Sequence, residues 1–148
     1  MNNAFLSILV ALDLCAIFSP QILLGRDREL TGNQLRNVTP QSAVIGKWYP
    51  FLQIIWAVIV ALAYLGFGIS LKIVDGHRQA GLALSALADI ATTDGITALW
   101  THIYPLPDRF GYRYIFEDSK RLRMVAILQL CLVAATTVLA VSWSMGVW

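Results

Sequence analysis

Charged residues are scarce in this sequence, and their scarcity sets its class. Asp, Glu, Lys and Arg together make up 14% of the 148 residues, whereas about a quarter of an ordinary soluble domain is charged. Hydrophobic residues make up 57% of the chain, so the composition excludes an ordinary soluble domain and indicates an integral membrane protein. At this length we expect one membrane domain over residues 1–148, without a second, soluble domain.

Cysteine and histidine are also rare, which limits the metal and redox chemistry to be expected. Cys15 and Cys131 both lie inside apolar segments and form no CxxC pair, so we expect two buried thiols and no disulfide or zinc site. His77 falls in a short connection between two apolar segments and His102 near the end of the segment that follows, so a metal site would need ligands from elsewhere. We therefore predict a protein without a metal or another cofactor.

Motifs of soluble catalysis and of nucleic-acid binding are missing as well. The sequence has no phosphate-binding loop, no Ser, His and Asp in the order of a hydrolase triad, and no basic patch suited to nucleic acid. We therefore expect the partners to be the lipid bilayer and a lipophilic small molecule, with no nucleic acid.

Apolar segments dominate the chain. About 20 mostly apolar residues suffice to cross a bilayer as a helix. Four segments reach this length, and they cover residues 4–24, 50–71, 80–104 and 124–147. We therefore predict an all-α protein, a bundle of four transmembrane helices.

Basic residues predict the orientation of this bundle. Nine of the eleven lysines and arginines lie in or beside the connections 25–49 and 105–123. Because cytoplasmic loops are enriched in Lys and Arg, these connections are expected in the cytoplasm and both termini on the non-cytoplasmic side. The connection 25–49 is expected to be irregular, with at most one short helical turn. The predicted location is a bacterial inner membrane or a eukaryotic endomembrane.

Two carboxylates interrupt the third apolar segment. Asp89 and Asp94 lie in the middle of residues 80–104, where a charged acid costs about 2.5–3.5 kcal/mol on insertion scales. At about 100° per residue, one helix sector about 140° wide contains Asp89, Thr93, Thr97, Thr101 and Asp94. A polar sector cannot face lipid, so it must face the bundle interior or another subunit.

Other spans offer few groups that could meet these carboxylates. Asp13 lies near the midpoint of the first span and is the expected third member of the acidic site. The other polar candidates in the neighbouring spans are Gln53, Gln129, Thr136 and Thr137. Because no Lys or Arg lies in a span core and burial disfavours the charged form, we expect at least one of the three acids to be protonated at neutral pH. The alternative interpretation is that polar residues only hold the helices together, at about 0.6–2 kcal/mol per contact.

Aromatic residues flank the second and third spans. Trp48 and Tyr49 open one span, and Trp100 and Tyr104 close the other, as is typical of anchors at the headgroup level. In the connection that follows, aromatic residues occupy alternate positions: Phe110, Tyr112, Tyr114 and Phe116. A period of two predicts an extended segment, either at the membrane interface or as a lid over a pocket ringed by Arg109 and Arg113.

Three functions are compatible with these patterns. The first is an enzyme that acts on a lipid-soluble small molecule by acid/base chemistry without a cofactor, through isomerisation, cyclisation or epoxide opening. There Asp94 would be the general acid, Asp89 its partner or base, and Asp13 would come from the facing helix. The expected substrate-binding residues are Thr93, Thr97, Trp100, Arg109 and Arg113. The other two functions are an accessory subunit of a larger membrane complex and a proton-coupled transporter that acts as a homo-oligomer.

Overall fold

Four long helices form the molecule in this computed structural model, which describes residues 2–24, 40–101, 103–108, 111–116 and 120–147. The helices are α1 (Asn2–Leu24), α3 (Pro40–Ser70), α4 (Gly76–Thr101) and α5 (Lys120–Ser144). Each contains a segment long and apolar enough to cross a membrane. The prediction of a four-helix bundle is therefore confirmed, and the architecture suggests a multi-pass membrane protein.

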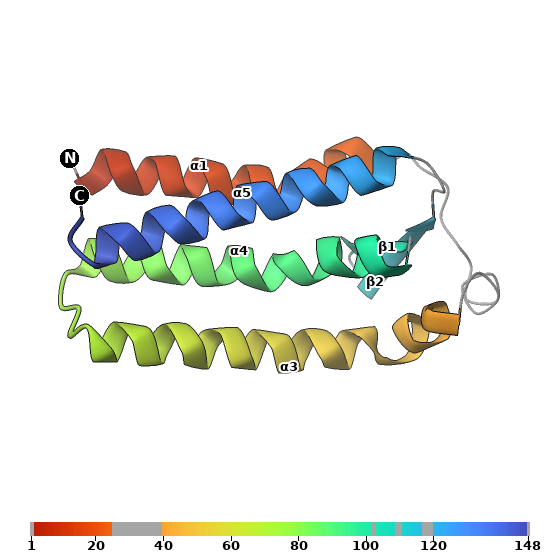
Figure 1. Cartoon of the computed structure of the whole chain (residues 1–148), viewed down its shortest axis with the longest axis horizontal. Helices are drawn as coiled ribbons and strands as arrows, with labels where there is room; N and C mark the ends of the chain where they lie inside the picture. Colours follow the sequence, from red (N-terminus) through yellow and green to blue (C-terminus); the bar gives the residue numbers. More distant parts are fainter. Residues whose placement is uncertain (1, 25–39, 102, 109–110, 117–119, 148) are drawn as a thin grey trace.

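Helix α4 occupies the central position in the bundle. It packs against α1, α5 and α3, whereas α3 packs chiefly against α4. Successive helices run in opposite directions, so that α1 begins and α5 ends at the same end of the bundle (Figure 1). Among the described residues, clusters of buried apolar side chains lie where α1 meets α5 and where both meet α4. The polar residues of α4 thus have protein on several sides.

Small residues allow α5 to approach α4 closely. A Cβ atom added at Gly81 would lie 3.0 Å from the ring of Trp143, and one at Gly95 would lie 2.9 Å from Oε1 of Gln129. In lipid, helices associate through van der Waals contact and hydrogen bonds, so close backbone approach is a main source of stability. Gly95 therefore sets the distance between the two helices beside Asp94.

Helix α3 begins ten residues earlier than the predicted second span. Residues 40–49, expected to belong to an irregular connection, are helical and continuous with the span. Pro40 suits the first turn of a helix, where no backbone N–H donor is needed, so the prediction of an irregular segment is wrong there. Pro50 inside the helix removes one hydrogen bond, and Figure 1 shows the first turns of α3 set at an angle to the rest.

A two-stranded hairpin follows α4 and was not predicted as a pair. Strand β1 (Ile103–Asp108) pairs antiparallel with β2 (Gly111–Phe116), with Tyr104 opposite Ile115. The helix stops at Thr101, three residues before the predicted end of the third span, because Pro105 disfavours the helical conformation at the preceding residue. The extended conformation predicted from the alternating aromatics is confirmed for residues 111–116; the side chains of that strand and the whole of Phe110 lie outside the described residues.

Two expectations about burial are wrong. Cys15 and Cys131 are free thiols with exposed side chains rather than buried ones. The buried positions of α1 recur every three or four residues, at Leu9, Asp13 and Ala16, and this spacing turns Cys15 outward. Both thiols therefore lie on the outer, apolar surface of the bundle.

Candidate functional site

Asp89 connects three helices through one carboxylate. Its Oδ1 accepts a hydrogen bond of 2.7 Å from the Thr137 hydroxyl of α5, and its Oδ2 accepts one from the Tyr64 hydroxyl of α3. The backbone carbonyl of Asp89 also accepts a hydrogen bond of 3.0 Å from Nε1 of Trp56. The Tyr64 hydroxyl lies 2.9 Å from Oγ of Ser85, one turn earlier on α4. Asp89, Tyr64, Ser85 and Thr137 are called the Asp89 cluster below.

Asp13 lies beside this cluster, and its carboxyl group differs from that of Asp89 in its hydrogen bonding. Its side chain is 4% exposed, and its carboxyl group is close enough to interact electrostatically with that of Asp89. Thr136 is its polar neighbour, but the Thr136 hydroxyl donates its proton to the Val133 carbonyl at 2.8 Å. Among the described residues neither carboxyl oxygen of Asp13 has a hydrogen-bond partner. Asp13 is therefore a buried acid without the usual compensating bonds.

Asp94 belongs to a second polar cluster, nearer the hairpin. Its Oδ1 accepts a hydrogen bond from the Tyr49 hydroxyl and one of 2.9 Å from Nε2 of Gln53, both on α3. Nε2 of Gln53 also lies 2.8 Å from the Tyr49 hydroxyl, so the three groups form a closed triangle. Asp94 is 5% exposed and its carboxylate is well supplied with donors. We call Asp94, Tyr49 and Gln53 the Asp94 cluster.

Tyr104 of the hairpin lies near the Asp94 cluster. The hydroxyl of Tyr104 donates to Oε1 of Gln129, and Nε2 of Gln129 donates to the carbonyl of Ala16 at 3.3 Å. Burial, reinforced by the nearby Asp94 carboxylate, raises the pKa of the Tyr104 hydroxyl above its ordinary value, so this group stays a neutral donor. Tyr104 is thus completely buried, and its predicted role as an exposed interface anchor is wrong. The same correction applies to Tyr49, which is 1% exposed.

The predicted acids therefore divide between two clusters. Asp13 and Asp89 come together, whereas Asp94 has its own partners on α3. Five positions separate Asp89 from Asp94 on one helix, which turns their side chains about 140° apart at about 100° per residue. Two of the polar candidates from neighbouring spans, Gln53 and Thr137, do bind these acids.

Three of the expected substrate-binding residues, Thr93, Thr97 and Trp100, have side chains in the described part of the chain. The Thr93 hydroxyl donates to the Ile90 carbonyl at 3.1 Å, and the Thr97 carbonyl accepts from Thr101 at 2.6 Å, so both groups bond within their own helix region. Trp100 is 63% exposed on the outer surface. Arg109 lies outside the described residues, and of Arg113 only the backbone, paired with Leu106, is described.

Tyrosines are the functional candidates that the sequence reasoning missed. Tyr64 was read as part of an apolar span, and Tyr49 as an interface anchor. A signal was present for Tyr64: a hydroxyl in the middle of an otherwise apolar span needs a hydrogen-bond partner, and the neighbouring span carries the acids.

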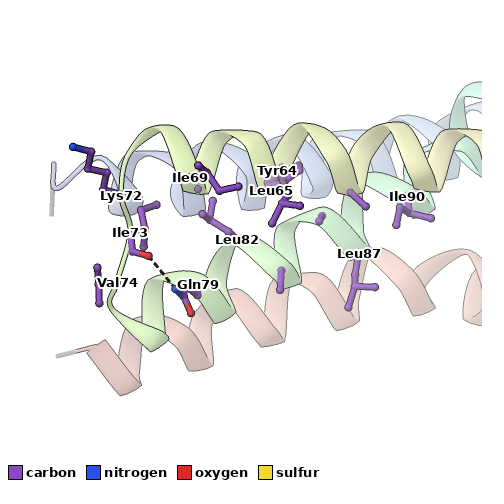
Figure 2. A pocket seen from close by; sticks show the side chains of 14 residues that line it. Tyr64, Leu65, Ile69, Lys72, Ile73, Val74, Gln79, Leu82, Leu87 and Ile90 are labelled. Carbon is purple, nitrogen blue, oxygen red and sulfur yellow. Dashed lines mark hydrogen bonds between the residues drawn. The ribbon is translucent and has the colours of Figure 1, made fainter.

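An apolar groove runs along the outer contact of α3 and α4. It has a volume of about 810 Å³ and extends from the connection between the two helices to Tyr64 and Ile90. Figure 2 shows Leu65, Ile69 and Leu82 along it, and Lys72, Val74 and Gln79 at its loop end. Tyr64 joins the two features, because it lines the groove and donates its hydroxyl proton to Asp89. We call this feature the α3/α4 groove.

Neither cluster resembles a metal centre. In the described ranges, no group of three or more His, Cys, Asp or Glu side chains could hold a metal ion. The Asp89 cluster offers hydroxyl and carboxyl groups, which are suited to moving protons. No family model, curated protein or solved structure matches the chain, so its function is argued from these contacts.

Proposed function

We propose that the protein catalyses a proton-transfer reaction on a lipid-soluble small molecule held in the α3/α4 groove, with Tyr64 and Asp89 as the proton-transferring pair. The observation that carries this proposal is the position of Tyr64, which lines the groove and is bonded to the carboxylate. Binding sites for small molecules are mostly apolar, with a few polar groups that face the ligand. Tyr64 supplies a polar group at this groove, since it lines the groove and its hydroxyl is bonded to Asp89.

The pair can move a proton without a cofactor. A proton that leaves a substrate carbon would pass to the Tyr64 oxygen while the phenolic proton passes to Oδ2 of Asp89. Return of a proton by the same route to a different carbon completes an isomerisation with no gain or loss of electrons. Cyclisation and epoxide opening begin instead with the delivery of a proton from the Tyr64 hydroxyl to the substrate. General acid–base catalysis of this kind contributes about 10²–10⁴-fold to a rate.

Asp94 has a different role in this proposal from the general acid expected from the sequence. Its carboxylate is buried and already accepts bonds from Tyr49 and Gln53, and it does not line the groove. We assign it to holding α3 against α4, which keeps Tyr64 in contact with Asp89.

Isotope labelling tests the reaction class although the substrate is unidentified. The purified protein would be incubated with a total lipid extract from its host cells in D₂O, and in parallel in water enriched in ¹⁸O. Isomerisation or cyclisation places deuterium on carbon, whereas hydrolytic epoxide opening places ¹⁸O in the product. We expect mass spectrometry to find one extract component that gains label only when the protein is present.

Matched variants identify the acting pair. Tyr64→Phe and Asp89→Asn are expected to slow label incorporation by about 10²-fold or more. Tyr49→Phe and Asp94→Asn remove the same groups from the other cluster, which only positions α3, and we expect them to slow labelling much less than the variants of the pair do. Labelling that depends on the Asp94 cluster and not on Tyr64, or no labelled component at all, would refute the proposal.

Proton-coupled transport is the second candidate, favoured by Asp13. A buried carboxyl group without a hydrogen-bond partner, next to a second acid, suits a site that is loaded and unloaded with a proton. In liposomes with an internal pH dye, a transporter would carry protons inward under an imposed gradient when extract lipids are supplied. Asp13→Asn would abolish that flux, and an unchanged flux in this variant would exclude Asp13 as the proton carrier.

A further inference from the structure

Lys72, at the loop end of the α3/α4 groove, ends α3 in an unusual backbone conformation. Its φ angle is +52°, the left-handed region. The amide of Lys72 donates to the Ile69 carbonyl at 3.0 Å, and the amide of Ile73 donates to the Gly68 carbonyl at 3.1 Å. This pair of bonds is the Schellman motif, in which the left-handed position is usually a glycine.

A lysine at this position has a conformational cost that glycine would not have. A left-handed conformation is unfavourable for a residue with a Cβ atom, and only glycine adopts it without strain. Strained backbone positions persist where the surroundings hold them, and they occur often at ligand-binding sites. The side chain of Lys72 is therefore the feature that needs an explanation.

The ammonium group of Lys72 has no partner in the part of the chain that the structure describes, in contrast to its neighbours. Asp75, the acid of the same connection, lies 3.4 Å from Nδ1 of His77 and 3.7 Å from Nε of Arg78. Over the described ranges, no hydrogen bond or ion pair involves the Lys72 side chain. Figure 2 shows its ammonium directed away from the helices at the mouth of the groove. A positive charge is thus available there for a ligand.

The groove connects this charge to the proposed proton-transfer pair. Lys72 and Tyr64 both line it, eight positions apart, which corresponds to about 12 Å at about 1.5 Å per helical residue. The wall between them is apolar and includes Leu65, Gly68, Ile69 and Leu82. The connection that carries Lys72 is tied to α4 by a hydrogen bond of 2.9 Å from Nε2 of Gln79 to the Ile73 carbonyl. This bond holds the backbone next to Lys72 against α4, which forms one wall of the groove.

We propose that the α3/α4 groove binds a single-chain amphiphile with an anionic head group, with its head at Lys72 and its hydrocarbon chain directed toward Tyr64. A lysine attracts a carboxylate or phosphate as a point charge, and the aliphatic wall takes one chain along the contact of two helices. If the proposed function holds, such an amphiphile is the substrate. It then reacts on its hydrocarbon chain, at a distance from the head group, and this part of the inference rests on the proposed function.

A photoreactive fatty acid with a diazirine on its chain tests the binding. The full chain in nanodiscs of zwitterionic phospholipid would be irradiated with this probe, and the labelled peptides would be mapped by mass spectrometry. We expect saturable labelling of α3 and α4 at groove residues, competed by an unlabelled fatty acid and more weakly by the fatty alcohol of equal length.

Variants of Lys72 and of the groove wall test separately how the head group and the hydrocarbon chain of the ligand contribute to binding. Lys72→Gln is expected to weaken binding about threefold to fivefold, the effect of losing one exposed ion pair. Lys72→Gly should weaken binding equally while the Tm stays constant or rises, because glycine relieves the left-handed conformation. Ala83→Phe fills the groove and is expected to abolish labelling there. Its control is Ala63→Phe, an exposed position of α3 outside the groove.

The outcomes distinguish this inference from the proposed function. Labelling spread evenly over all outer helix faces, or unaffected by Lys72→Gln and Ala83→Phe, would overturn the amphiphile site even if Asp89 proves necessary for turnover. Saturable groove labelling together with no isotope incorporation would support the site and refute the reaction. Equal competition by the fatty alcohol would refute the role of Lys72 as the anchor of an anionic head.

Discussion

Asp13 and Asp94 are both about 95% buried, yet their surroundings give them opposite expected effects on stability. Asp94 accepts bonds from two side chains, whereas neither oxygen of Asp13 has a partner among the described residues. A buried carboxyl group that lies next to Asp89 and has only Thr136 as a polar neighbour among the described residues is expected to destabilise the fold, because its desolvation and its repulsion are little compensated.

Replacing Asp13 is therefore expected to stabilise the protein. Asp13→Asn removes the ionisable group with little change in shape, and we expect the free energy of unfolding to rise by about 1 kcal/mol. The measurement is the thermal or denaturant unfolding of the purified protein in detergent, with Asp13→Glu as the control that keeps the acid. A loss of stability in Asp13→Asn would mean that the carboxyl group has a partner after all.

Gly95 gives a second prediction at the residue scale. A Cβ atom there would lie 2.9 Å from Oε1 of Gln129, and Gln129 links Tyr104 to Ala16. We expect Gly95→Ala to lower the free energy of unfolding by about 1–3 kcal/mol, because the methyl group displaces the Gln129 amide from its bonds to Tyr104 and Ala16. The control is Gly66→Ala, where nothing lies within 4 Å, and it should leave stability unchanged or slightly higher.

Among the elements, α3 depends most on polar contacts. It packs chiefly against α4, and four of its side chains hold it there: Tyr49, Gln53, Trp56 and Tyr64. Most of its large apolar side chains are exposed on the outer surface. The position of α3, and hence the shape of the groove, is therefore set by a few hydrogen bonds to Asp89 and Asp94.

Removing one of these acceptors should loosen α3 selectively. Asp94→Ala removes the acceptor that the Tyr49 hydroxyl and the Gln53 amide share, at a cost of about 1–3 kcal/mol. Hydrogen exchange measured in detergent should show faster exchange in the first half of α3, with α1 and α5 unchanged. Asp94→Asn keeps one acceptor oxygen and should have a smaller effect. Uniform acceleration across all helices would contradict the selective anchoring of α3.

At the scale of the whole molecule, the helix order makes a prediction about orientation. The termini lie at one end of the bundle, together with the connection between α3 and α4 (Figure 1). The distribution of basic residues predicts that this end is non-cytoplasmic. In a background of Cys15→Ser and Cys131→Ser, the variant Val74→Cys should react with a membrane-impermeant maleimide in intact cells, since Val74 is 87% exposed.

The opposite end of the bundle supplies the control for this labelling. Lys120→Cys, at the exposed start of α5, should react only after the membrane is permeabilised. The reverse pattern for the two variants would show that the loops rich in Lys and Arg face the outside.

The sequence alone determined the four spans, because the ability of a segment to cross a bilayer depends on its own length and apolarity. It also determined that Asp89 and Asp94 face protein, because a polar sector on one helix has no partner in lipid. The tertiary structure decided which groups meet them. The pairing of Asp89 with Tyr64 and Thr137, and of Asp94 with Tyr49 and Gln53, depends on how neighbouring helices are shifted and rotated against one another. Close contacts between small residues set that relation, and no single span contains the information.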